Sequence, residues 1–297
     1  MPGRYRAAVD RHHAPVQPAI VTRRRISSAL WQFGDAPATT VLAPFGGGSA
    51  YSVADWLPHV ADSAIIVQYP GRGPRAGEAH ATSLGELAHE VAIELATHTT
   101  GPLTLVGHSV GALLCHEITR ELEDRGRRVA QLVVSAARPA HLSLLREEQV
   151  LAMDRAAWLS ALVGNGFGTP ELMANQLAVD MALDALRADY LLLARHLRAG
   201  GAVRAPLLAI GSSDDPWLDE DHLTAWGELT TGPFATAVMP GDHFYYRNDP
   251  VAFGKAVRAG CAARPGPTDV PPAVRRTPPP HTAPGDLEFA ATKLETT

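Results

Sequence analysis

Short apolar runs alternate with helical patterns through the middle of the chain, and this alternation constrains the fold more than any other feature of the sequence. Six runs have the length and composition of buried strands, at residues 39–44, 64–70, 103–108, 131–137, 207–213 and 236–241. Three amphipathic patterns predict helices at 83–98, 111–126 and 218–229. Strands that alternate with helices form a parallel sheet covered on both faces, so the sequence predicts an α/β fold.

One segment interrupts this alternation. Residues from about 141 to 199 contain only helical patterns, although a simple crossover between two parallel strands needs far fewer residues. Ligands of open α/β sheets bind outside the carboxyl ends of the strands, and an insertion that follows a strand is placed to cover that edge. We therefore expect a helical lid over about 141–199. Three glycines in its loop at 163–170 are candidate hinges, which predicts that the lid is mobile.

The two ends of the chain differ from its middle. Residues 1–27 carry Arg, His and Pro without periodicity and are expected to be an irregular N-terminal extension. Residues 262–297 are rich in proline, which predicts a disordered or polyproline-like tail. One domain is then expected over residues 28–261.

Composition excludes several classes of function. The net charge is −5 and no basic face is evident, so a nucleic-acid partner is not expected. The sequence contains no apolar run long enough to span a bilayer and does not start with the apolar core of a secretory signal. Two cysteines without a Cys/His cluster predict neither a disulfide framework nor a metal site. The expectation is a cytoplasmic protein without a membrane span.

The sequence Gly107-His108-Ser109-Val110-Gly111 stands where a predicted strand ends and a predicted helix begins. In this strand–turn–helix context a GxSxG sequence indicates a nucleophile elbow, which exposes the serine hydroxyl at the edge of the sheet. Glycines on both sides allow the strand and the helix to approach closely. The amide of Val110, at the start of the helix, is placed to stabilise an oxyanion formed beside Ser109.

A serine hydroxyl needs a base, and in this type of fold the acid and the histidine follow the serine in the sequence. Of the later histidines only His243 follows a late predicted strand, in the sequence MPGDHFYY. The acid is expected at the end of the preceding strand, where Asp214 and Asp215 both qualify. The residues alone do not decide which of these two aspartates is the acid.

A second oxyanion-hole amide is expected from the loop after an early strand. Gly46, Gly47 and Gly48 provide a loop whose backbone N–H groups can approach a ligand closely. A phosphate-binding loop is poorly supported because no GKS or GKT follows, and the spacing of a dinucleotide-binding fingerprint is missing.

Together these segments resemble one family. The sequences APFGGGSAYSVADWLP, IIVQYPGRGPR, LVGHSVGALLCHEITRELE, LRADYLLL, DPWLDEDHLTAW and MPGDHFYY are similar to those of the stand-alone type II thioesterases of polyketide and nonribosomal peptide pathways. The resemblance runs from about Leu30 to Arg258. It implies an α/β-hydrolase fold with a helical lid, and an enzyme that removes acyl groups from the phosphopantetheine arm of acyl or peptidyl carrier proteins, without a cofactor of its own.

The resemblance also implies roles for single residues. Ser109 matches the nucleophile and His243 the base, while Gly46 and Val110 match the oxyanion-hole positions. The pattern of an Asp-Pro pair with Trp226 eleven residues later selects Asp215 as the acid.

The chain departs from the family at two places. Phe45 stands where the family commonly has a histidine, in HAGG, and the chain reads SAARPA at 135–140 where the family usually reads SGRRAP.

The same residues also allow other interpretations. A product-releasing thioesterase or cyclase, or a carboxylester hydrolase, would use the same residues. A non-catalytic scaffold that binds a carrier protein would not need them. If carrier proteins are the partners, their acidic surfaces and the phosphate of the arm would be met by arginines at the mouth of the site, and Arg72 and Arg75 are the candidates.

Overall fold

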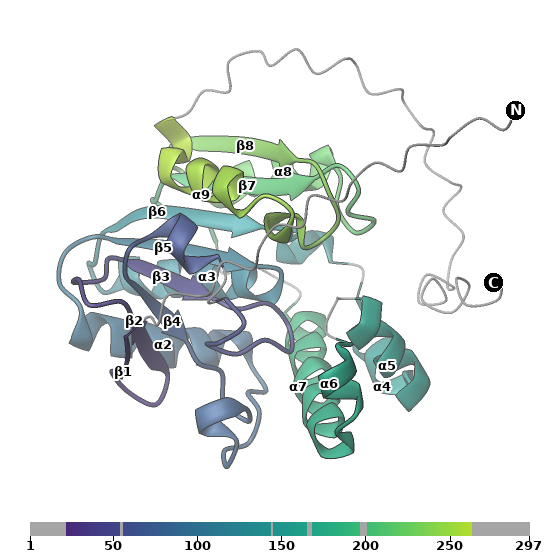
Figure 1. The fold of residues 1–297 in the computed structure, drawn as a ribbon. Coiled ribbons are helices and arrows are strands. Elements are labelled where there is room, and N and C mark those ends of the chain that lie inside the picture. The colour runs from purple at the N-terminus through teal and green to yellow at the C-terminus, as the bar shows by residue number, and fades with distance from the viewer. Residues whose placement is uncertain (1–21, 54–55, 144, 165–167, 197–200, 263–297) are drawn as a thin grey trace, which may run out of the picture.

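The computed structural model describes residues 22–262 except 54–55, 144, 165–167 and 197–200 (Figure 1). The described part of the chain contains one sheet of eight strands. The strands are β1 (Arg23–Arg25), β2 (Leu30–Phe33), β3 (Thr40–Ala43), β4 (Ala64–Val67), β5 (Leu103–His108), β6 (Val129–Ser135), β7 (Leu207–Ser212) and β8 (Phe234–Met239). Each of the six apolar runs identified in the sequence overlaps one of these strands, so the prediction of six strands is confirmed, although β8, at the edge of the sheet, is mostly half-buried.

The strand order is β1-β2-β4-β3-β5-β6-β7-β8. Strands β3 to β8 pair in parallel, whereas β1 pairs antiparallel with β2 and β2 antiparallel with β4. This mostly parallel sheet with helices around it is the α/β-hydrolase fold. The antiparallel edge was not predicted. Strand β1 consists of three exposed arginines, so it has no apolar signal, and regular structure therefore begins inside the stretch expected to be irregular.

Helices cover both faces of the sheet. Those of the described residues are α1 (Leu57–Val60), α2 (Leu84–His98), α3 (Val110–Asp124), α4 (Glu147–Ala152), α5 (Arg155–Gly164), α6 (Pro170–Met173), α7 (Gln176–Arg195), α8 (Glu220–Ala225) and α9 (Pro250–Ala259). Successive side chains of a strand point to opposite faces. In β3, Val41 and Ala43 accordingly join the core beneath α2 and α3, while Leu42 joins the core beneath α1 and α9.

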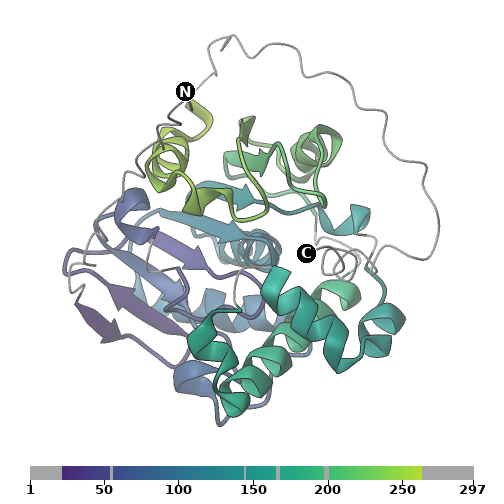
Figure 2. The ribbon, with the colours of Figure 1, turned by 45° about the vertical axis from the view of Figure 1, so that its right-hand side comes forward.

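Helices α4 to α7 form the insertion between β6 and β7 (Figures 1 and 2). They pack around a small core of their own, which includes Val150, Trp158 and Leu186. Helix α7 reaches the carboxyl end of β3, because Leu186 lies against the loop that contains Gly46 and Gly47. The predicted helical insertion is confirmed, and its position at this edge of the sheet is that of a lid.

Some expectations lie outside the described residues. These are the proline-rich tail, apart from residue 262, the first 21 residues, and part of the proposed hinge loop at 163–170. Within the described ranges, no helix combines the length and apolar character that crossing a membrane requires.

Candidate active site

Ser109 occupies a sharp corner between β5 and α3. Its backbone has φ 56° and ψ −122°, and a positive φ is unusual for a residue with a side chain. The Ser109 amide donates to the Ser135 carbonyl at 2.8 Å, which ties the corner to the end of β6. Such strain persists only where the surrounding structure enforces it, and this geometry is that of a nucleophile elbow.

The two glycines of the elbow are required by close backbone contacts. A Cβ atom on Gly107 would lie 2.0 Å from the Gly111 carbonyl oxygen, and a Cβ on Gly111 would lie 2.2 Å from the carbonyl oxygen of Ala43. Both distances are far below van der Waals contact. The strand, the helix and the neighbouring strand therefore meet at the separation that places the half-buried Ser109 at the turn.

His243 follows β8 and is paired with Asp215, which follows β7. The His243 Nδ1 atom lies 2.7 Å from Asp215 Oδ2, and the aspartate side chain is fully buried while the imidazole is 20% exposed. The other carboxylate oxygen of Asp215 accepts from the Trp217 amide at 2.9 Å. Asp214 is exposed, and its amide donates to the Gly241 carbonyl. The residues alone left the choice between Asp214 and Asp215 open, and in the structure it is Asp215 that contacts the His243 imidazole.

The imidazole of His243 lies beside the elbow. Its ring centroid is 5.1 Å from that of His108, the residue before Ser109, and 5.1 Å from that of Phe244. Ser109 and His243 come from strands that end at the same edge of the sheet. The fold thus gathers the serine, the imidazole and the carboxylate at that edge.

Gly46 lies directly against the start of α3. A Cβ atom on Gly46 would be 3.1 Å from Val110 Cγ2. The neighbouring amides are engaged within the protein, since Gly47 donates to Asp189 Oδ2 at 2.7 Å and Gly48 donates to the Phe45 carbonyl at 2.9 Å. Among the described residues, the amide of Gly46 is therefore the one of the three that has no protein acceptor. This leaves it for a ligand beside Val110.

A buried polar chain behind the elbow was missed by sequence reasoning. His108 Nδ1 lies 2.9 Å from Ser135 Oγ, which is hydrogen-bonded to the Tyr245 hydroxyl. Burial, together with the nearby charges of His243 and Arg247, holds the pKa of His108 well below its usual range, and burial raises the pKa of Tyr245. The chain is therefore neutral and fastens β5, β6 and the segment after His243 to one another. Residues so far apart in sequence give no local signal of this contact.

Phe45, at the position where the family commonly has a histidine, belongs to the aromatic wall of the site. It is 1% exposed and meets Phe244 edge-on, with ring centroids 5.2 Å apart. It also lies edge-on to His108 at 6.3 Å. The substitution places an apolar ring where the family has a titratable one and leaves the groups around Ser109 and His243 in place.

Two sequence motifs that marked the family meet in space. Arg72, from QYPGR after β4, forms two hydrogen bonds of 2.5 Å with Asp189, from LRAD on α7. In the same motif, Tyr69 donates its hydroxyl proton to the Pro44 carbonyl at 2.7 Å, and Gln68 Oε1 accepts from the Ala50 amide at 3.1 Å. The QYPGR segment therefore holds the glycine loop through hydrogen bonds to the loop backbone. Sequence reasoning identified both motifs but gave neither a structural role.

The prediction that Arg72 and Arg75 face a partner at the mouth is wrong. Arg72 is 7% exposed and Arg75 is 6% exposed. The guanidinium of Arg75 pairs with Glu78 and Glu90 and also donates to the Gln68 carbonyl. Burial by itself lowers the pKa of both arginines, but their carboxylate partners outweigh it and raise the pKa. Both arginines are buried and paired with carboxylates of this chain, so neither is available to an acidic partner surface.

Trp226, the third sequence feature that marked the family, is buried directly after α8. Its indole N–H donates to the Ala137 carbonyl at 2.8 Å. This bond connects the segment after α8 to the loop that follows β6. Trp226 thereby links the segment after β7, which carries Asp215, to the loop after β6.

A family model described as the thioesterase domain matches residues 39–258. This match covers well over half of the chain and includes every site residue described above. The protein therefore belongs to the thioesterase family.

Individual relatives agree with this assignment. The thioesterase PikA5 of Streptomyces venezuelae is 34% identical over 232 residues, which are 74% of this chain and 81% of that protein. The phenyloxazoline synthase MbtB of Mycobacterium tuberculosis is 30% identical over 258 residues, which are 85% of this chain but only 18% of the synthase. Among solved structures, the type II thioesterase BorB from the borrelidin biosynthetic cluster superposes with a TM-score of 0.70 at 28% identity, covering 79% of this chain and 98% of that one.

Proposed function

We propose that this protein hydrolyses acyl groups from the phosphopantetheine thiol of carrier proteins in polyketide or nonribosomal peptide synthesis. The observation that carries the proposal is the pairing of His243 with the buried Asp215 beside a strained serine elbow. The relatives named thioesterases support the substrate class.

In the first half of the reaction, Ser109 Oγ attacks the thioester carbonyl while His243 Nε2 accepts the serine proton. Asp215 accepts a hydrogen bond from Nδ1–H, which keeps Nε2 free as the base and stabilises the imidazolium that forms. The amides of Gly46 and Val110 donate to the oxyanion of the tetrahedral intermediate, with the N-terminus of α3 adding to the favourable potential. When the C–S bond breaks, His243 returns the proton to the leaving thiolate and an acyl-serine ester remains.

In the second half, water takes the place of the thiol. His243 removes a proton from the water, whose oxygen attacks the acyl carbonyl, and the same two amides stabilise the second oxyanion. The proton then passes to Ser109 Oγ, which releases the carboxylic acid. Each proton transfer is carried by His243, so we propose that the reaction uses no metal or cofactor beyond the pantetheine arm of the substrate.

The proposed partners are acyl or peptidyl carrier proteins, and the proposed location is the cytoplasm, where such carriers are loaded. An editing enzyme should accept many short acyl groups. A panel of acyl carrier proteins, acyl-CoAs and simple esters, with products measured by mass spectrometry, tests this specificity. A strong preference for esters over thioesters would contradict the proposal.

The Ser109→Ala variant tests the assignment of the nucleophile. It should fold normally but lose at least about three orders of magnitude in turnover, and it should no longer react with a fluorophosphonate probe. A folded Ser109→Ala protein that keeps near-native turnover would contradict the mechanism.

A second candidate is release of a finished product from a synthase. It is favoured by the match of 85% of this chain to a segment of a much longer synthase. In the same panel, a releasing enzyme should prefer one long acyl chain over short ones, which separates it from an editing enzyme.

A further inference from the structure

Asp189 connects the lid to the glycine loop at the edge of the sheet. Its side chain is fully buried on α7, and one of its oxygens accepts from the Gly47 amide at 2.7 Å. Both oxygens also accept from Arg72, at 2.5 Å each, and the same guanidinium donates to the Gly48 carbonyl at 3.2 Å. One carboxylate and one guanidinium thus hold the residues that follow Gly46.

These contacts restrain a loop that has little intrinsic rigidity. Gly47 has φ +77°, a conformation that glycine adopts at little cost but does not enforce. The planar guanidinium and the carboxylate meet in a bidentate arrangement, which fixes direction as well as distance. Because Gly46 precedes Gly47 directly, a fixed Gly46–Gly47 peptide restricts the orientations open to the Gly46 amide.

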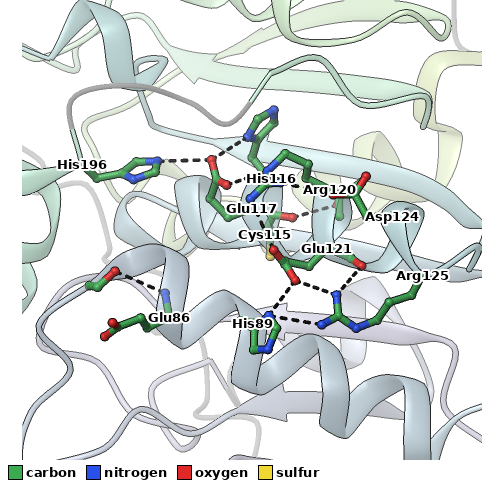
Figure 3. Close-up of polar contacts among 12 residues, drawn as sticks. Glu86, His89, Cys115, His116, Glu117, Arg120, Glu121, Asp124, Arg125 and His196 are labelled. Atoms are coloured by element: carbon green, nitrogen blue, oxygen red, sulfur yellow. Dashed lines mark hydrogen bonds and ion pairs between the residues drawn. The ribbon is translucent and has the colours of Figure 1, made fainter.

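Helix α7 has a second contact with the body of the protein at its C-terminal end, seven residues after Asp189. His196, at its C-terminus, has Nε2 at 3.3 Å from Glu117 Oε1 on α3, as Figure 3 shows. Glu117 is 2% exposed and also contacts His116 and Arg120 of the same helix. Helix α3 begins at Val110, the second proposed oxyanion donor. Both donors are therefore connected to α7, one through Asp189 and the other through α3.

We propose that Asp189 is a positioning residue for the oxyanion hole. Through Gly47 and Arg72 it holds the Gly46 amide toward Val110, so the hole is complete only while α7 is docked on the glycine loop. This inference rests on the proposed function, because it assumes that an oxyanion forms beside Gly46 and Val110. It also makes α7 the fixed element of the lid.

The test is the Asp189→Asn variant. An asparagine has one acceptor oxygen, so its NH2 group must face either the Gly47 amide or the Arg72 guanidinium, both of which are donors. The loop should then shift, and small displacements of catalytic groups are costly. We expect kcat per active site to fall about tenfold to a hundredfold, with KM changed less than about threefold, since the loss of a whole oxyanion donor costs about a hundredfold to a thousandfold.

A transition-state analogue supplies a readout that a merely structural role would not change. An alkyl boronic acid accepts the Ser109 oxygen at boron while the serine proton passes to His243, and the resulting tetrahedral boronate has an oxygen in the oxyanion hole. Asp189→Asn should weaken the boronic acid Kd by a factor similar to the fall in kcat. A partly unfolded population would instead lower the number of binding sites and leave their Kd unchanged.

The matched control is Glu147→Gln, which removes an exposed ion pair between α4 and Arg195 of the same helix α7. It should keep both kcat and the boronic acid Kd. If Asp189→Asn does not fold, as judged by circular dichroism, Arg72→Lys replaces it, because lysine keeps the charge but not the bidentate geometry. The expected pattern of kcat, KM and Kd for Arg72→Lys is the same.

The outcomes separate the two proposals. Native kcat and native boronic acid affinity in a folded Asp189→Asn or Arg72→Lys protein, together with an inactive Ser109→Ala, would overturn the role of Asp189 and leave the proposed function standing. Native turnover in Ser109→Ala would overturn the proposed function, whatever Asp189→Asn does. A loss of kcat and boronate affinity in Asp189→Asn but not in Glu147→Gln supports the positioning role.

Discussion

Replacing Asp215 by asparagine should nearly abolish activity through the tautomer of His243. The carboxylate of Asp215 is fully buried and accepts two hydrogen bonds, from the Trp217 amide at Oδ1 and from His243 Nδ1 at Oδ2. In Asp215→Asn the carbonyl oxygen can remain with the Trp217 amide, which turns the NH2 group toward Nδ1. Nδ1 then becomes an acceptor, the ring proton moves to Nε2, and the base that Ser109 needs is lost.

The expected loss is about four orders of magnitude in turnover, the amount typical of a triad whose histidine is held in the wrong tautomer. At about 1.4 kcal/mol for each factor of ten, this corresponds to about 5 kcal/mol of transition-state stabilisation. The measurement is steady-state hydrolysis of an acyl thioester, with thiol release followed by a chromogenic disulfide. Thermal unfolding should show that the variant remains folded, because asparagine has nearly the size of aspartate.

Asp214→Asn is the matched control, one residue away. Asp214 is exposed and its backbone amide, which the variant keeps, donates to the Gly241 carbonyl, so this variant should keep turnover within about threefold of the native protein. If Asp214→Asn were inactive while Asp215→Asn retained turnover, the assignment of the acid would be refuted.

Two further predictions concern stability and motion. Because His108 is held neutral in the folded protein while an unfolded histidine binds a proton below about pH 6.5, the unfolded state binds more protons below that pH. The free energy of unfolding, measured in urea, should therefore fall as the pH drops below about 6.5, by up to about 1.4 kcal/mol per pH unit from this group. The His108→Gln variant should show a weaker dependence of the unfolding free energy on pH. An unchanged pH dependence in this variant would contradict the prediction. Hydrogen exchange should show weaker protection in α4 to α6 than in the sheet, with α7 protected near Asp189 and His196; equal protection throughout the insertion, with and without ligand, would argue against a mobile lid.

The alternation of apolar runs with helical patterns was enough to predict the sheet and the insertion. A buried parallel strand is apolar on both faces, so runs such as 103–108 stand out in the sequence without knowledge of their neighbours. The GxSxG elbow could be predicted for a similar reason, because its two glycines are required by contacts within a few residues of Ser109 and with the adjacent strand. The positions of His243 and of the two aspartates followed from the order of strand ends along the chain.

The antiparallel edge was invisible to this reasoning. Strand β1 is formed by Arg23–Arg25, and an exposed edge strand buries no face, so no apolar alternation marks it. Its pairing with β2 consists of backbone hydrogen bonds, and every residue except proline has the same backbone donor and acceptor.

The contact of Asp215 with His243, which the resemblance had predicted, and the contacts of Arg72 are visible only in the tertiary structure. Neighbouring aspartates have the same chemistry in the sequence, and only the direction of the chain after β7 buries one against His243 and exposes the other. Arg72 and Asp189 are separated by 117 residues, so nothing local distinguishes an arginine that faces a partner from one that is paired in the interior. Burial makes the difference, because a buried guanidinium requires a carboxylate, and the folded chain alone determines which carboxylate lies within reach.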